Sequence, residues 1–201
     1  MFAAVPGFGS WSCYKFWAFS APLNFLYRFM HPRYVLAMTR QVHDAFFLPS
    51  TPTSVVKDLE RLLSPYESMG WPMQALFPIV TGPDVLKSIT GWKTQQPTSE
   101  DRRGTTIIPR FLVLAAELDV LCTPPVLLDA AKRYRAAFRH CVRSRKLDGI
   151  REYDDEHIEG NDEDGRDGIS FKVIKGTAHH LQNDVGWERG AEEVWRWTES
   201  L

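Results

Sequence analysis

The sequence predicts an α/β fold, because two separate stretches each pass from a strand pattern through polar residues into a helix pattern. The first stretch covers residues 105–138 and the second covers residues 169–198. Each polar junction holds a side chain suited to acid–base chemistry, Asp119 in the first and His179 in the second. We expect the two loops to meet, so that the Asp119 carboxylate and a ring nitrogen of His179 share a proton.

Composition limits the classes of protein to consider. The 201 residues are 44% hydrophobic, which is enough for one domain with a sizeable core. A net charge of −1 implies no general attraction to nucleic acid. Between residues 11 and 30, Lys15, Pro22 and Arg28 interrupt eight aromatic residues, so no membrane span is expected. Three scattered cysteines and no signal-peptide pattern favour an intracellular, cytoplasmic protein without a metal or cofactor.

Residues 11–92 have helical periodicity broken by Pro and Gly, and no convincing strand. Pro32 is expected to begin one helix, and Thr53 or Ser54 to cap another. Pro72 and Pro83 are predicted in the first turns of short helices. The inward apolar residues of the first two helices are predicted to be Tyr34, Val35, Met38, Val42, Ala45 and Phe46, and Val55, Val56, Leu59, Leu62 and Leu63. Gln95 to Arg103 is predicted to be a polar linker.

Residues 107–116 form a mostly apolar run, as expected of a strand buried on both faces. After Asp119, Thr123 and Pro124 fit the N-cap and first position of a helix. The inward residues of that helix are predicted to be Leu127, Ala130, Ala131, Tyr134, Ala137 and Phe138.

Residues 139–168 are basic and then acidic, with few apolar residues, so we predict a solvated, partly disordered insertion. A calcium loop is the alternative, but its pattern fails. Counting from Asp162, the sixth position is Asp167 instead of Gly, and the twelfth is not Glu.

The second strand pattern places Ile169, Phe171 and Val173 on one face and leads into Gly176 and the paired histidines His179 and His180. Asn183 and Asp184 are natural caps for the helix that follows. Its apolar face is predicted to contain Trp187, Ala191, Val194, Trp195 and Thr198.

Two segments resemble the C-terminal part of an α/β-hydrolase, namely "LVLAAELDVLCTPP" and "VIKGTAHHLQND". The resemblance implies that Asp119 is the acid of a catalytic triad and His179 its base. The histidine of the family follows the loop glycine by three residues, which favours His179 over His180. The implied activity is hydrolysis of a small apolar carboxylic ester or related acyl compound, as in esterases and lipases. The alternative for both histidines is a structural role at the start of the last helix.

The same resemblance implies a partial α/β-hydrolase fold of about three sheet strands (near 2–6, 107–116 and 169–175) with a helical cap of residues 11–92. Its parts are a remnant core strand at 1–10, a helical lid or cap at 11–104, and a C-terminal α/β core at 105–201 carrying the insertion at 139–168. The first strands and the oxyanion loop of the family are absent from this sequence. An exposed sheet edge would then favour self-association.

The nucleophile expected in such a family is missing, because no Gly-x-Ser-x-Gly motif occurs in the sequence. Ser68 is the nearest candidate, but Tyr66 stands where the motif needs glycine. Ser10 lacks a following glycine, and Cys13 and Cys122 are more typical of packed thiols. We therefore expect this chain alone to be inactive, and leave open whether it is an enzyme.

Two alternatives from other classes remain. A non-catalytic interaction protein would use the aromatic residues 11–30 and the acidic insertion to bind a partner. A lipid acyltransferase would use the His-x-x-x-x-Asp pattern formed by His179 and Asp184.

Overall fold

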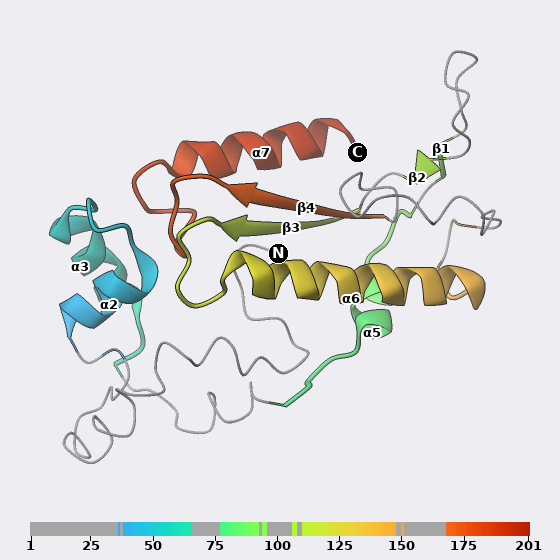
Figure 1. The fold of residues 1–201 in the computed structure, drawn as a ribbon, viewed down its shortest axis with the longest axis horizontal. Helices are drawn as coiled ribbons and strands as arrows, with labels where there is room; N and C mark the ends of the chain where they lie inside the picture. Colours follow the sequence, from blue (N-terminus) through green and yellow to red (C-terminus); the bar gives the residue numbers. More distant parts are fainter. Residues whose placement is uncertain are drawn as a thin grey trace.

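The computed structural model describes residues 36, 38–65, 77–92, 94–95, 106–107, 110–147, 150 and 168–201. Within them the elements, in chain order, are α2 (Thr39–Phe46), α3 (Thr53–Leu62), α5 (Gly82–Ser88), β1 (Thr94–Gln95), β2 (Thr106–Ile107), β3 (Phe111–Ala116), α6 (Pro124–Arg143), β4 (Ile169–Ile174) and α7 (Trp187–Glu199) (Figure 1). Helices around a small parallel sheet confirm the α/β class in this broad sense. None of the helices in the described residues combines the length and apolar character needed to cross a bilayer.

The central layer is the pair of parallel strands β3 and β4. Phe111 pairs with Ile169 at one end and Ala116 with Ile174 at the other. The pair lies between α6 on one face and α7 on the other (Figure 1). The two-residue strands β1 and β2 form a separate antiparallel pair.

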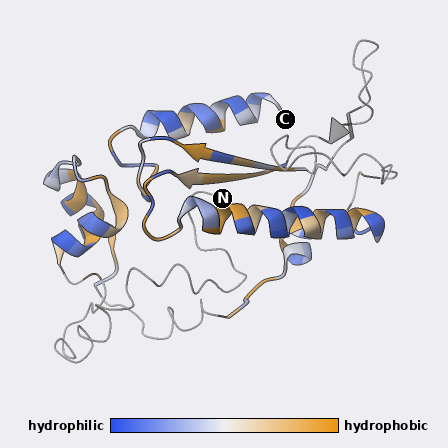
Figure 2. Cartoon of the chain, viewed as in Figure 1, coloured by the Kyte–Doolittle hydropathy of each residue, from blue (hydrophilic) through white to orange (hydrophobic). Residues whose placement is uncertain are grey.

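One core lies between the sheet and α6. In a strand, alternate side chains point to the same face, so Val113 and Ala115 of β3 share this core with Ile169 of β4. The contributing stripe of α6 includes Leu127, Ala131, Tyr134 and Phe138, all buried. Figure 2 shows the mixed hydrophobic and hydrophilic colouring of α6 that this stripe produces. Leu86 of α5 and Trp92 join the same core, so residues predicted to belong to the cap pack on the α/β core.

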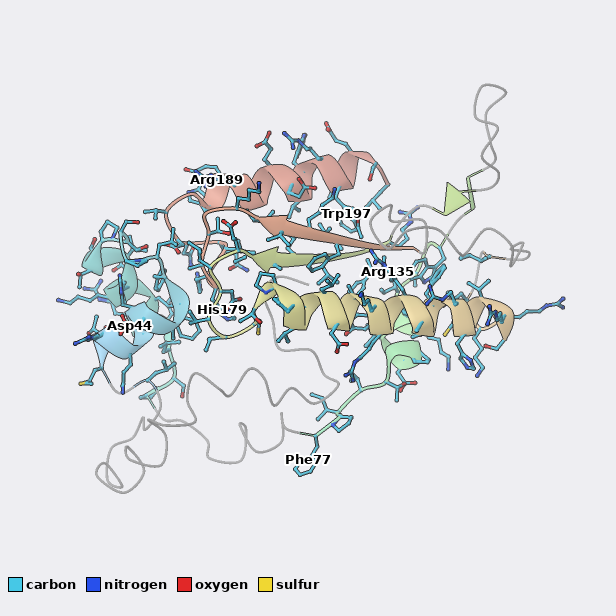
Figure 3. The ribbon with its side chains drawn as sticks, viewed as in Figure 1. Asp44, Phe77, Arg135, His179, Arg189 and Trp197 are labelled. Atoms are coloured by element: carbon cyan, nitrogen blue, oxygen red, sulfur yellow. The ribbon has the colours of Figure 1, made fainter. Side chains whose placement is uncertain are left out.

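The second core lies between the sheet and α7. The other set of β3 side chains, Leu112, Leu114 and Ala116, packs there with Ile174 and Leu181. Val194 and Trp197 of α7 cover this cluster, and Figure 3 labels Trp197 between α7 and β4. β3 is therefore covered on both faces, which explains its continuous apolar sequence.

The predicted inner face of α7 is wrong except for Val194. Trp187 and Trp195 are 48% and 65% exposed, while Gly190 is the buried position. The predicted N-cap residues of α7, Asn183 and Asp184, are also wrong. The helix begins after Gly186, whose φ of +82° suits glycine. In the part of the chain that the structure describes, α7 packs on two strands, where it buries the stripe of Gly190, Val194 and Trp197 and leaves its other aromatic side chains outside.

The boundaries around the core differ from the predictions in two places. β2 ends at Ile107 and β3 begins at Phe111, so residues 107–116 are not one strand. Pro109 lies between them in the sequence and has no N–H to donate to a ladder. α6 continues to Arg143, so residues 139–143 belong to a helix instead of the predicted insertion. Its apolar stripe continues to the buried Cys141, which outweighs the basic residues around it.

The polar insertion predicted at 139–168 also does not begin directly after α6. Leu147 and Ile150 are buried in the core beside that helix. At its end, the described Gly168 is buried too. Residues 151–167, which hold the acidic run, lie outside the described residues.

Helices α2 and α3, in the segment predicted to be a lid or cap, agree with the sequence in part. Val42 and Ala45 of α2 are buried as predicted, and so is Val56 of α3. Met38 and Leu62 are exposed instead. The remaining predicted inward residues Phe46, Val55, Leu59 and Leu63 pack from partly buried positions.

The starts of α2, α3 and α5 show the limits of predicting helix starts from N-cap patterns. α2 begins at Thr39. The predicted helix starts at Pro32 and Pro72 lie outside the described residues, as does all of 1–35. The N-cap of α3 is Pro52, so Thr53 and Ser54 lie in its first turn. Pro83 is in the first turn of α5, as predicted. Gln95 belongs to β1 instead of the polar linker.

The layered core predicts a large difference between two leucines. Leu114→Ala removes a side chain with no exposed surface and should lower the free energy of unfolding by about 2–5 kcal/mol. Leu62→Ala is the matched control, because Leu62 is 80% exposed, and should change it by less than about 0.5 kcal/mol. Chemical denaturation followed by circular dichroism measures both. Equal losses would contradict the arrangement of the sheet between two helices.

Candidate functional site

Two loops meet beyond the carboxyl ends of β3 and β4, and we call residues 117–123 the acid loop and residues 175–186 the histidine loop. Parallel strands end at the same edge of a sheet, so both loops lie at one edge. The backbone N–H of Glu117 donates to the carbonyl of Ile174 at 3.0 Å, and that of Leu118 donates to Thr177 at 3.0 Å. The Glu117 carboxylate accepts from the backbone N–H of Gly176 at 2.8 Å. These contacts connect the two loops directly.

The structure brings Asp119 and His179 together, as the sequence predicts. Asp119 Oδ2 lies 2.8 Å from His179 Nδ1, although the residues are 60 positions apart. The Asp119 side chain is fully buried, and the His179 side chain is 17% exposed. Figure 3 labels His179 in the region between the sheet and the helices α2 and α3.

The remaining oxygen of Asp119 is held by the backbone. Asp119 Oδ1 accepts hydrogen bonds from the N–H groups of Leu121 at 2.8 Å and Cys122 at 2.9 Å. A carboxylate only accepts, so the contact with His179 requires a proton on Nδ1. The other ring nitrogen, Nε2, is then the one left to accept a proton. A buried carboxylate in this position orients the imidazole and stabilises the imidazolium that proton transfer produces.

Gly176 allows the histidine loop to turn at the end of β4. Its φ is +65°, and a Cβ there would lie 2.5 Å from the guanidinium of Arg189. Arg189 at the start of α7 donates to the carbonyl of Lys175 at 2.9 Å. The side chain of the buried Thr177 donates to Ile174 at 2.8 Å. The glycine and its neighbours thus set the path of the chain toward His179.

His180 has a packing role, which separates it from its neighbour. Its ring is stacked 5.4 Å from the ring of Phe47 and edge-on to Phe46. Its buried Nδ1 has no hydrogen-bond partner among the described residues. Burial, and then the adjacent His179, lower the pKa of His180. A neutral ring between aromatic side chains is unsuited to taking protons from a substrate. The structural role expected at the start of α7 is filled by Gly186.

Asp184 is the second buried carboxylate of the site, and the sequence predicts it as a helix cap or as the acid of the His-x-x-x-x-Asp pattern. It is 2% exposed, and it accepts hydrogen bonds from the N–H groups of Leu48 at 2.9 Å and Val185 at 2.7 Å. The hydroxyl of Thr51 also donates to it. Asp184 therefore joins the histidine loop to the chain between α2 and α3.

Sequence reasoning missed the part played by residues 46–51. The ring of Phe46 lies 5.3 Å from that of His179, and the carbonyl of Phe46 accepts from the N–H of His180 at 2.9 Å. Thr51 is buried at 5% exposure beside Asp184. The apolar pair Phe46 and Phe47 at the end of a helical pattern was the one available signal. Contacts between positions more than 130 residues apart leave no local pattern.

One group of side chains has the chemical types of a metal site. Asp119, Cys122 and His179 have ligand atoms within 4.8 Å of one another. Zinc bonds of 2.0–2.2 Å to oxygen and nitrogen place two ligands of a tetrahedral ion roughly 3.3 Å apart. The 2.8 Å between Asp119 and His179 is a hydrogen-bond distance instead. The group fits a hydrogen-bonded pair beside a packed thiol better than a zinc centre.

The candidate nucleophiles divide into two groups. Ser10, Cys13 and Ser68 lie outside the described residues. Cys122 is described and has no exposed surface, which agrees with the predicted packing role. The sequence-predicted residues that the structure brings together are thus Asp119 and His179.

The burial of His180 predicts a dependence of stability on pH. Because its pKa is lowered from 6.5 in the folded chain, the unfolded chain takes up the proton first as the pH falls. The contribution of neutral His180 to the free energy of unfolding is complete above pH 6.5. It is lost as the pH falls from there through the lowered folded-state pKa. The variant His180→Phe should have a shallower loss of unfolding free energy between about pH 7.5 and 5. Urea titrations at several pH values measure it, with His140→Phe at an exposed site of α6 as control. An unchanged slope in His180→Phe would contradict the assignment.

Three comparisons with known proteins, against protein-family models, curated proteins and solved structures, found no match to this chain.

Proposed function

We propose that Asp119 and His179 are the acid and the general base of a site that cleaves carboxylic esters or related acyl compounds, in the manner of an α/β-hydrolase. The observation that carries the proposal is the 2.8 Å contact between Asp119 Oδ2 and His179 Nδ1. The two residues come from loops at the same edge of a parallel sheet, with the acid before the histidine in the chain. That order is the one found in α/β-hydrolases.

The proposed chemistry follows from the two ring nitrogens of His179. Nδ1 donates to Asp119, so Nε2 takes the proton of a serine hydroxyl as it attacks the ester carbonyl. The imidazolium then gives the proton to the leaving alcohol, and an acyl-enzyme ester remains. Water attacks this ester with the same base, which releases the acid and restores the serine. Asp119 stabilises the positive charge on the ring in both halves of the cycle.

The nucleophile of this cycle is not assigned to a residue of the chain. No Gly-x-Ser-x-Gly motif occurs in the 201 residues, and the buried Cys122 has no surface from which to reach a substrate. We propose that a serine on a separate segment supplies it. Loss of the nucleophile lowers turnover by up to about 10⁶ in a serine protease, so the pair alone should be nearly inactive.

The surroundings of His179 support an apolar substrate. The ring of Phe46 lies against that of His179, and behind it Val42, Phe47 and Val56 form a buried apolar cluster. Apolar walls around a few polar groups are typical of small-molecule sites. A partial α/β-hydrolase fold with residues 11–104 as lid or cap, and a cytoplasmic location, belong to the same proposal.

The non-catalytic interaction protein is the alternative. It depends on residues 11–30 and 139–168, and of these the structure describes 139–147, 150 and 168. The acyltransferase alternative needs Asp184 to take part in chemistry, whereas three donors already bind this carboxylate.

The proposal predicts how activity depends on the pair. With p-nitrophenyl butyrate, the chain of 201 residues should release nitrophenol no faster than its His179→Ala variant. An extended chain whose in-frame upstream coding sequence supplies a Gly-x-Ser-x-Gly segment should be active. In that chain Asp119→Asn should lower kcat by about 10⁴, because the histidine then holds the wrong tautomer.

Phe138→Leu, a substitution in the α6 core away from the site, is the matched control and should retain most of the activity. Activity that survives His179→Ala in the extended chain would overturn the proposal. An upstream reading frame without a nucleophile segment would do the same and would favour the interaction protein.

A further inference from the structure

We propose that Asp184 is a positioning residue, which holds the imidazole of His179 against Asp119 by binding the histidine loop to the turn between α2 and α3. We call residues 47–52 the α2–α3 turn. The inference rests on the proposed function only in taking His179 as the reacting group. Asp184 itself does not contact the proton shared by Asp119 and His179.

First, Asp184 is hydrogen-bonded to the α2–α3 turn. Its two carboxylate oxygens accept from the backbone N–H of Leu48 and from the hydroxyl of Thr51, 136 and 133 positions away. Both Thr51 and Asp184 are buried, at 5% and 2% exposure. Hydrogen bonds to a buried charged acceptor are stronger than neutral ones, so this contact is a firm connection between the two segments.

The second step connects Asp184 to the backbone beside His179. The N–H groups of Asn183 and Asp184 both donate to the carbonyl of His180 at 3.1 Å, which closes a turn. The N–H of His180 donates to the carbonyl of Phe46 at 2.9 Å. Thus the peptide groups on both sides of His180 are held, one through Asp184 and the other through the end of α2.

The third step is the position of the His179 ring. Residues 177–186 contain no helix or strand, so regular hydrogen bonding does not set their path. The His179 ring has Asp119 on Nδ1 and the ring of Phe46 beside it. Phe46 immediately precedes the α2–α3 turn that Asp184 holds. Release of Asp184 therefore frees the turn, Phe46 and the histidine loop together.

The chemistry of the site requires a carboxylate at position 184. All three groups directed at it are donors, namely Leu48 N–H, Val185 N–H and the Thr51 hydroxyl. Asparagine has the same shape, but one of its ends is an NH₂ group that only donates. In Asp184→Asn, the NH₂ group therefore points at one of these donors. Two buried donors cannot form a hydrogen bond, so at least one hydrogen bond to residue 184 is lost.

The test measures the state of the His179 ring directly and does not require enzymatic activity. Nitrogen-15 NMR of the histidine rings identifies the Nδ1–H of His179, with His179→Gln used for assignment. We expect the unsubstituted chain to give a slowly exchanging Nδ1–H signal and Asp184→Asn to lose it. Hydrogen exchange of the amides at 46–51 should become at least about tenfold faster in Asp184→Asn. Thr51→Val, which removes one donor at nearly constant shape, should give an intermediate effect on both signals.

The control is Asp129→Asn on α6, an exposed aspartate that pairs with Arg133 at 2.8 Å. It should leave both measurements unchanged. If Asp184→Asn accelerates exchange at 46–51 but leaves the His179 signal as it was, Asp184 only anchors the turn and the inference fails. If neither measurement changes, the inference fails as well. Should Asp184→Asn not fold, an unaltered His179 signal in Thr51→Val overturns it.

These outcomes separate the inference from the proposed function. Loss of the Nδ1–H signal in Asp184→Asn supports positioning even where no ester is cleaved. Conversely, ester hydrolysis that depends on His179 but not on Asp184 supports the function and overturns the inference. An acyl transfer abolished by Asp184→Asn with an unchanged His179 signal would assign Asp184 a direct chemical role, which also overturns it.

Discussion

The arrangement of this site depends on the demands of one buried carboxylate. Asp119 has no exposed side-chain surface, and a charged group so placed is costly unless hydrogen bonds replace its water. Leu121 and Cys122 supply two of those bonds from the backbone, and His179 supplies the third. The first two fix the acid loop after β3. The third draws in the histidine loop, so satisfying one charge determines how the ends of two strands meet.

A second buried carboxylate, Asp184, follows the paired histidines in the histidine loop and has different partners. Asp119 is bound by its own loop and by a ring nitrogen, whereas Asp184 is bound mainly by the turn between α2 and α3. Two adjacent histidines consequently differ in character. His179 has a carboxylate on one nitrogen and partial exposure, while His180 lies against Phe46 and Phe47 with a lowered pKa. The difference arises from what each ring touches, since the residue type is the same.

The errors in the predicted elements have a common physical origin. Periodicity shows which side chains share a face of a helix, but not which face another element will cover. Helical periodicity predicts Trp187 and Trp195 on the inner face, yet Val194 and Trp197 are the residues that pack on the sheet. At the end of α6, a basic run suggested a solvated segment, although the buried stripe continues to Cys141. Burial is decided by the neighbouring surface, which local patterns do not describe.

The sequence alone was enough to predict the two strand-to-helix units that carry the acid and histidine loops, and the contact between Asp119 and His179. Apolar runs, Thr123 with Pro124, and Gly176 are local signals, because backbone geometry restricts which residues fit a helix start or a turn. Only the tertiary structure decided that Asp119 and His179 lie 2.8 Å apart and that His180 packs. It alone decided that Phe46, Leu48 and Thr51 support the histidine loop. Those contacts join segments far apart in the chain, and their geometry depends on packing that no local pattern records.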